Sequence, residues 1–304
     1  MTMAIFRLDH CANIKQAFLS GWCLGFGYFL AGLWWIGLAF LVESQFIWGM
    51  PFAIVGLPAV LACFFALAFV LSFYFWRSGI SRILIFSLTL TTTELLRGEM
   101  FSGFPWNAIG MVLGGSLELS QIASVIGLSG LNFLTSFLFA IPALLFSERK
   151  KVLRLIAPLI FVIGITSLYL FGYQRLNTPQ SEVIAGVRIR IMQPAIAQDE
   201  KFDKEYSARI LTNYLSLSSR GSYPSTEGMN GITHLIWPET AFPFLLDRSP
   251  KAREEISRIL PKGSVLLTGA VRAEDKPDKS GRFYFNSIQV LDDSGAITAS
   301  ADKV

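Results

Sequence analysis

Cysteine and histidine are scarce in this sequence of 304 residues. The three cysteines, Cys11, Cys23 and Cys63, never form a CxxC pair, and the two histidines, His10 and His234, lie far apart. The sequence therefore predicts neither a disulfide framework nor a metal site, and a Ser-His-Asp triad would depend on His234 alone.

Charged residues are also few, at 16% of the chain, and they are unevenly distributed. Residues 1–173 contain 15 Asp, Glu, Lys and Arg residues, whereas residues 174–304 contain 33. The first part holds repeated apolar runs near the roughly 20 residues that cross a bilayer. We therefore expect a transmembrane helical domain over 1–173 and a water-soluble domain over 174–304. Neither part has the excess of basic residues that is typical of nucleic-acid binding.

Five apolar segments predict five transmembrane helices, at about residues 18–42, 46–76, 80–96, 120–146 and 155–173. Eight of the nine Lys and Arg residues that flank them fall on alternate loops, which would share one side of the membrane. By the positive-inside rule that side is the cytoplasm. The N-terminus is then cytoplasmic, and the fifth crossing delivers the second domain to the outer side.

The first predicted hairpin contains small and aromatic residues in positions that suggest their roles. Gly21 and Gly25 form a GxxxG pattern, which favours close packing of helices. Trp34, Trp35 and Trp48 lie toward its outer end, where we expect them to anchor the chain at the membrane surface.

One membrane segment contains ionisable residues, which are costly at bilayer depth unless they face protein or a polar cavity. Glu94 and Arg97 lie three residues apart on a predicted helix and can pair. The GFPW loop at 103–106 follows, with the aromatic rings of Phe104 and Trp106. We expect the four side chains to form a site at a lipid entrance. The alternative is an interfacial loop that only anchors the protein.

The second part alternates strand and helix patterns, which predicts a layered α/β domain. Strands are expected at 187–193, 234–237 and 264–270, helices at 200–218 and 250–260, and a hairpin at 283–291 and 296–301 with its turn at 292–295.

Two residues of this part are candidates for chemistry. Glu239 follows an apolar strand directly, where Pro238 and Trp237 would shield a carboxylate that acts as a general base. Lys303 is the last charged residue of the final predicted strand. A solvated turn glutamate and a surface lysine are the ordinary alternatives.

The sequence resembles the apolipoprotein N-acyltransferases, bacterial inner-membrane enzymes with a nitrilase-like domain between transmembrane helices. The resemblance rests on the Gly- and Trp-rich hairpin of 21–36, TELLRG at 93–98, SGFPW at 102–106, QP at 193–194, WPET at 237–240, LTG at 267–269 and YFNS at 284–287. It implies a polytopic α-helical membrane domain followed by the N-terminal part of a nitrilase-like α/β domain, which is one half of an αββα sandwich.

The resemblance also implies a reaction. A fatty acyl group moves from a phospholipid to the N-terminal amine of the diacylglyceryl-cysteine of an apolipoprotein, through a thioester acyl-enzyme and without a cofactor. Glu239 matches the general base and Lys303 the residue that stabilises the oxyanion. The expected location is the bacterial cell inner membrane, with residues 174–304 in the periplasm.

The family's nucleophilic cysteine lies beyond the position of Lys303, and no cysteine follows Cys63 in this sequence. We therefore expect a chain that is truncated at both ends relative to the family and inactive by itself. Two alternatives stay open. One is a non-catalytic membrane remnant or lipid-binding scaffold; the other is a transporter with an outer domain, which the many spans and the pair of Glu94 and Arg97 suggest.

Overall fold

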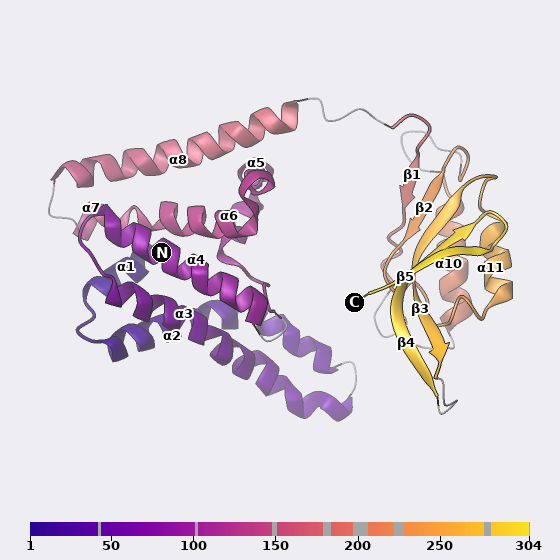
Figure 1. Cartoon of the computed structure of the whole chain (residues 1–304), viewed down its shortest axis with the longest axis horizontal. Helices are drawn as coiled ribbons and strands as arrows, with labels where there is room; N and C mark the ends of the chain where they lie inside the picture. Colours follow the sequence, from indigo (N-terminus) through magenta and orange to yellow (C-terminus); the bar gives the residue numbers. More distant parts are fainter. Residues whose placement is uncertain are drawn as a thin grey trace. The chain divides into compact units, whose positions relative to one another are not determined.

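The structure is a computed structural model that describes residues 1–41, 44–100, 103–147, 151–178, 184–196, 206–221, 228–276 and 281–303. The chain divides into two compact units, Met1–Gln180 and Ser181–Val304, and each is described by itself (Figure 1). The long helix near the end of the first unit continues to Asn177, past the domain boundary expected at residue 173.

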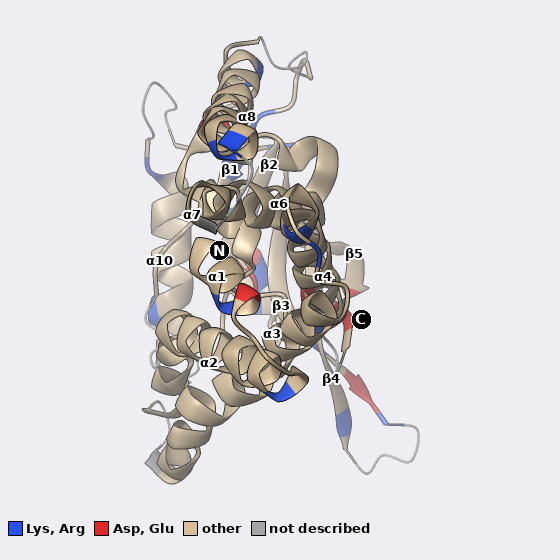
Figure 2. Cartoon of the chain, turned by 90° about the vertical axis from the view of Figure 1, so that its left-hand side faces the viewer, with Lys and Arg blue, Asp and Glu red and all other residues tan. Residues whose placement is uncertain are grey.

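The first unit is helical, and its ribbon carries few charged residues (Figure 2). Its elements are α1 (Thr2–Asp9), α2 (Ile14–Leu33), the short helices η1 (Trp34–Leu41), η2 (Ser44–Gly49) and η3 (Phe52–Gly56), α3 (Leu57–Tyr74), α4 (Ile80–Glu99), η5 (Ile109–Gly115), α5 (Leu117–Ser120), α6 (Ala123–Ala140), α7 (Ala143–Ser147) and α8 (Lys151–Asn177).

Among the described residues, four helical stretches are long and apolar enough to cross a membrane: Ile14–Leu41, Gln45–Tyr74, Ala123–Phe146 and Lys151–Asn177. The fifth predicted span, at 80–96, is also helical. As α4 it has 20 residues, which is about 30 Å and close to the thickness of the hydrocarbon core. It is less apolar than the other four because Arg82, Glu94 and Arg97 lie along it, and all three are buried within the unit.

Contacts at the two ends of the bundle show how α4 runs. At one end, the Asp9 carboxylate at the end of α1 accepts hydrogen bonds from Trp76 Nε1 and Arg82 Nη1, each at 3.0 Å. At the other end, the ring of Trp106 stacks on that of Trp35, with 5.5 Å between centroids. Asp9 and Trp35 lie near the two ends of α2, and Arg82 and Trp106 lie near the two ends of α4. Since Asp9 contacts Arg82 and Trp35 contacts Trp106, both helices run from one end of the bundle to the other.

The later helices connect the same two ends. Thr2 Oγ1 donates to the Phe139 carbonyl at 2.9 Å, so α6 ends beside α1. Gly172, near the end of α8, packs on the main chain of Glu118 so closely that a Cβ would lie 1.9 Å from the Glu118 carbonyl oxygen. Glu118 belongs to α5, before α6, at the end that holds Trp106. In the described part of this unit, α2, α3, α4, α6 and α8 therefore join the two ends, and α8 finishes at the end opposite α1.

Small residues determine how α2 packs on α3. A Cβ on Gly21 would lie 2.7 Å from the carbonyl oxygen of Phe65, and a Cβ on Gly25 would lie 2.7 Å from Phe65 Cβ. The close helix packing that the GxxxG pattern predicts is confirmed. Phe65 and Phe69 are buried at this contact and belong to the hydrophobic core of the unit.

The second unit contains a five-stranded mixed sheet in the order β1-β2-β3-β4-β5 (Figure 1). Its elements are β1 (Ile189–Ile191), α10 (Ser207–Ser219), β2 (His234–Trp237), α11 (Pro250–Ser257), β3 (Val265–Asp275), β4 (Arg282–Asp292) and β5 (Ile297–Asp302). The first three strands are parallel, and β4 and β5 continue the sheet antiparallel. The predicted strands and helices are confirmed with shifted bounds, while residues 200–205 of the predicted helix lie outside the described residues.

Successive side chains along each strand point to opposite faces of the sheet. Trp237 and Leu266 are buried with residues of α10 and α11 in one core. The Trp237 ring lies 4.7 Å from that of Tyr214, and its Nε1 donates to Ser218 Oγ at 3.0 Å. Burial raises the pKa of the Tyr214 hydroxyl to about 12. The neighbouring Ile236 points to the opposite face, where the candidate site lies.

Candidate functional site

Glu239 follows β2 at a point where its loop touches β3. The N–H of Gly269 donates to the Pro238 carbonyl at 3.2 Å, and the Gly269 carbonyl accepts from the N–H of Ala241 at 2.9 Å. A Cβ on Gly269 would lie 2.4 Å from the Cα of Glu239. Glycine at this position therefore allows the loop to place Glu239 directly beside β3.

Lys303 reaches the same place from the β4–β5 hairpin. The register of this hairpin pairs Ser287 with Asp302. The next residue along, Lys303, donates its main-chain N–H to the Asn286 carbonyl at 2.8 Å. Lys303 and Asn286 are thereby held opposite each other on neighbouring strands.

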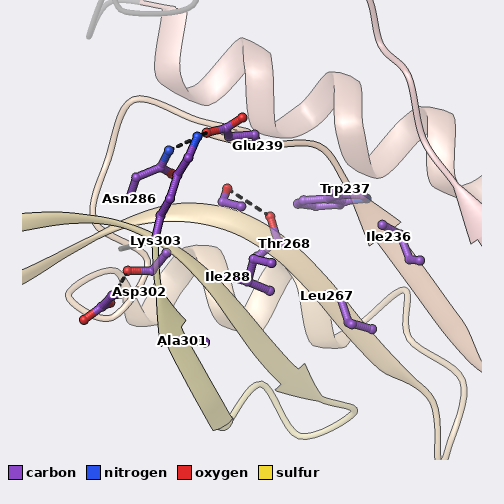
Figure 3. Close-up of a pocket in the computed structure, with 12 residues that line it drawn as sticks. Ile236, Trp237, Glu239, Leu267, Thr268, Asn286, Ile288, Ala301, Asp302 and Lys303 are labelled. Atoms are coloured by element: carbon purple, nitrogen blue, oxygen red, sulfur yellow. Dashed lines mark hydrogen bonds and ion pairs between the residues drawn. The ribbon is translucent and has the colours of Figure 1, made fainter. Parts of the chain in front are cut away.

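Three side chains meet at this edge of the sheet (Figure 3). Lys303 Nζ lies 3.1 Å from Glu239 Oε1, and the same oxygen accepts a hydrogen bond from Asn286 Nδ2. The side chains of Glu239 and Lys303 are 62% and 69% exposed. The expectation that Glu239 is shielded from water is wrong, because its side chain is 62% exposed, while Trp237 itself is buried against Tyr214 of α10.

A cavity of about 480 Å³ lies beside the cluster. Its lining comes from residues of β2, β3, β4 and β5 and from Glu239, and Glu239, Asn286 and Lys303 lie together at one side of it (Figure 3). The lining residues are Ile236, Trp237, Glu239, Leu267, Thr268, Gly269, Asn286, Ser287, Ile288, Ala301, Asp302 and Lys303. An apolar cavity with a carboxylate and an ammonium group at one side suits a hydrocarbon chain that carries a reactive carbonyl.

Asp302, the residue before Lys303, is held by two neighbouring strands. It accepts hydrogen bonds from Arg272 Nη2 at 2.6 Å and Nε at 3.0 Å, and from Ser287 Oγ at 2.5 Å. The Arg272 hydrogen bond, and next the one from Ser287, lower the pKa of Asp302 to about 2. The end of β5 is therefore fixed to β3 and β4 by a charged side chain.

The four residues that the sequence assigns to a lipid entrance lie together in the first unit. Glu94 and Arg97 form an ion pair at 2.7 Å, and each side chain is only 1% exposed. Arg97 Nη1 donates to the Trp106 carbonyl at 2.9 Å and also to the Phe104 carbonyl. The Trp106 side chain is half exposed beside Trp35.

Sequence reasoning gave no role to Asn286, although it quoted the YFNS segment. Counting outward from the predicted turn at 292–295 pairs Asn286 with Ala301. A register shift between Val290 and Leu291 in the observed hairpin helps to bring Asn286 opposite Lys303 instead. Across the described ranges, no group of three or more His, Cys, Asp or Glu residues could hold a metal ion.

These features define a polytopic membrane protein whose α/β unit holds a paired carboxylate and lysine at an apolar cavity. A family model described as "Apolipoprotein N-acyltransferase N-terminal domain" matches residues 1–141. A curated protein of Rhodopseudomonas palustris named apolipoprotein N-acyltransferase is 44% identical over 311 residues, covering 99% of this chain and 58% of the relative. Proteins of the same name from Bradyrhizobium diazoefficiens and Sinorhizobium medicae are 44% and 42% identical, each over 96% of this chain.

The chain is similar to apolipoprotein N-acyltransferases over nearly its whole length, as its motifs indicate. It spans 54% to 58% of the length of these three relatives. The match covers 99% of the chain in the first of these comparisons.

Proposed function

We propose that this chain supplies the membrane unit and the base and lysine of the active site of an apolipoprotein N-acyltransferase. The reaction transfers a fatty acyl group from a phospholipid to the N-terminal amine of the diacylglyceryl-cysteine of an apolipoprotein. The observation that carries the proposal is the contact of 3.1 Å between Lys303 Nζ and Glu239 Oε1 at the apolar cavity.

In the first half-reaction a cysteine thiol attacks the ester carbonyl of the phospholipid. Glu239 removes the thiol proton, the new C–S bond forms, and negative charge develops on the carbonyl oxygen. The ammonium group of Lys303 stabilises that oxyanion. The C–O bond then breaks, and the lysophospholipid leaves with the proton from Glu239. The resemblance places this cysteine after Lys303 in the family, whereas Cys11, Cys23 and Cys63 precede it.

In the second half-reaction the amine of the lipoprotein attacks the thioester. Glu239 takes the proton of the amine, Lys303 again stabilises the oxyanion, and a C–N bond replaces the C–S bond. The proton returns to the cysteine thiolate. Both the ester and the thioester are activated acyl groups, so the reaction requires no cofactor.

Both substrates carry lipid anchors, which gives the membrane unit its purpose. We place the protein in the bacterial inner membrane with the end that holds α1 on the cytoplasmic side, because eight of the nine flanking basic residues belong there. After five crossings the second unit is periplasmic. Phe104 and Trp106 then lie at the outer end of the bundle, where they border the entrance for the acyl chain.

The test uses a chimera in which residues 1–304 are followed by the part of the R. palustris relative beyond the matched region. After incubation with phospholipid, intact-protein mass spectrometry should show a mass increase of one fatty acyl group. We expect Glu239→Gln to abolish this acylation and Lys303→Met to reduce it strongly.

Two matched variants control for surface charge. The Glu254 side chain is 63% exposed, close to the 62% of Glu239, so Glu254→Gln should leave acylation intact. Lys262 is an exposed lysine of the same unit, so Lys262→Met should also leave acylation intact and is the control for Lys303→Met. Full acylation of Glu239→Gln would contradict the base assignment. A folded chimera that is never acylated would favour a non-catalytic scaffold.

A further inference from the structure

Arg97 is the largest of the fully buried side chains in the described part of the chain. Its Nε and Nη2 donate to the two carboxylate oxygens of Glu94, at 3.0 Å and 2.7 Å. Its guanidinium carbon lies 5.0 Å from the ring centroid of Phe29. Both side chains of this bidentate pair are only 1% exposed, and they line a small cavity of about 230 Å³ together with Pro105. The hydrogen-bonding capacity of the pair is used mainly within the protein.

The remaining nitrogen of Arg97 is directed at the loop that follows α4. Nη1 donates to the carbonyls of Phe104 and Trp106, the latter at 2.9 Å. The main-chain carbonyl of Arg97 accepts from the N–H of Phe104 at 3.0 Å. One residue thus holds the loop through both its side chain and its main chain.

The backbone of the loop is shaped for this contact. Gly103 has φ +79°, and a Cβ there would lie 2.2 Å from the Gly98 carbonyl oxygen of α4. Asn107 at the other end of the loop has φ +56°, and its carbonyl accepts a hydrogen bond from Tyr28 of α2 at 3.0 Å. Between these two fixed points, Trp106 stacks on Trp35 with an interplanar angle of 24°.

We propose that Arg97 is a positioning residue that holds Trp106 against Trp35, and that Glu94 orients the guanidinium for this task. An arginine is required because its planar fork makes two bonds to Glu94 and still donates to the loop; a lysine offers a compact charge without that geometry. The consequence for phospholipid use rests on the proposed function above. The positioning role itself is argued only from the contacts of Arg97 with the loop.

Arg97→Lys tests the proposal in the full 304-residue chain, because it keeps a positive charge beside Glu94. Stacked tryptophans give an exciton couplet in circular dichroism, and Trp35→Phe provides the reference spectrum in which this couplet is lost. We expect Arg97→Lys to lose the couplet while keeping the helical signal. An intact couplet in folded Arg97→Lys protein would overturn the proposal.

The same helix offers a matched control. Arg82 is also a buried arginine of α4, paired with Asp9 at 3.0 Å, and it lies at the opposite end from the loop. Arg82→Lys should keep the couplet. If Arg97→Lys does not yield folded protein, Glu94→Gln decides in its place: loss of the couplet in folded protein supports the proposal, and an unchanged couplet contradicts it.

Kinetics of the chimera separate positioning from a structural role. We expect Arg97→Lys to raise the KM for phospholipid severalfold and to leave the acylation rate at saturating phospholipid unchanged, since Glu239 and Lys303 are untouched. Arg82→Lys should change neither value. An unaltered KM together with a lost couplet would refute the role in substrate use. An inactive parent chimera would refute the proposed function and leave the couplet as the test of positioning.

Discussion

At the scale of single residues, Gly269 determines how closely the loop of Glu239 approaches β3. The atoms nearest to a Cβ there all belong to the main chain of residues 238–240, so no flexible side chain can move aside. Gly269→Ala should displace Glu239 from Asn286 and cost about 1–3 kcal/mol of stability. In the chimera it should reduce acylation, whereas Gly281→Ala, with no atom within 4 Å, should not. Equal acylation rates in the two variants would contradict this account.

Asp302 is expected to contribute to the acid response of the second unit, together with Asp275 and Asp292, whose pKa values are also lowered by hydrogen bonds. Its pKa of about 2 lies below the ordinary value of 3.8 because of the hydrogen bonds from Arg272 and Ser287. A lowered pKa in the folded state means that the stabilisation is present above about pH 4 and disappears as the pH falls toward 2. Arg272→Gln should therefore lower the thermal midpoint at neutral pH, and the difference from the unmodified chain should shrink on acidification.

The measurement is a series of thermal unfolding curves between neutral pH and about pH 2. Arg258→Gln is the control, because Arg258 pairs with Glu254 on an exposed helix surface and such pairs contribute little. A difference between the unmodified chain and Arg272→Gln that stays constant with pH would exclude Asp302 as its source.

Sequence patterns found the residues of the site more readily than their neighbours. The position of Glu239 after an apolar strand was a weak signal, and the roles of Glu239 and Lys303 came from the family resemblance. Their contact joins residues 64 positions apart. It depends on the pairing of β3 with β4, which no local pattern specifies. The burial of Trp237 beneath α10 was also not predicted, because a four-residue apolar strand does not show which of its faces a helix covers.

At the scale of elements, α2 packs closely on α3 through its glycines. Gly25 faces Phe65 and Ala62, and a Cβ would lie 2.7 Å from Phe65 Cβ. Gly25→Leu should force the helices apart and lower the thermal midpoint in detergent, at a cost of about 1–3 kcal/mol. Gly27 lies two residues away with no atom within 4 Å of the same position. Gly27→Leu should leave the midpoint unchanged, and an equal loss in both variants would show that packing against α3 is not the cause.

The apolar pattern predicted a transmembrane helix at 80–96, but it did not show how this helix accommodates its charged residues. In the described part of the chain, α4 is not among the four stretches that are long and apolar enough to cross a membrane. Its buried charged residues are instead neutralised inside the bundle: Arg82 by Asp9 at one end and Arg97 by Glu94 at the other. A helix whose buried charges are paired within the protein can cross a membrane without being strongly apolar. The spacing of Glu94 and Arg97 predicted their pairing, whereas the contact of Arg82 with Asp9 of α1 becomes visible only when the helices are assembled.

At the scale of the whole molecule, the number of crossings determines on which side the second unit lies. Five crossings place residues 181–304 opposite the N-terminus, whereas four would return them to the same side. The contacts Asp9–Arg82 and Trp35–Trp106 lie at opposite ends of α4 and support the count of five. The crossing of α4 is therefore the step that decides where the proposed chemistry takes place.

Reporter fusions test this step directly, since alkaline phosphatase is active only outside the cytoplasm. Fusions after residue 107 and after residue 180 should be active, and fusions after residues 78 and 150 should be inactive, because eight of the nine flanking basic residues belong to the latter side. β-Galactosidase at the same four positions should give the reciprocal pattern and controls for expression. Inactive phosphatase after residue 107 would show that α4 does not cross. Combined with inactivity after residue 180, it would place Glu239 and Lys303 in the cytoplasm and exclude a periplasmic acyl transfer.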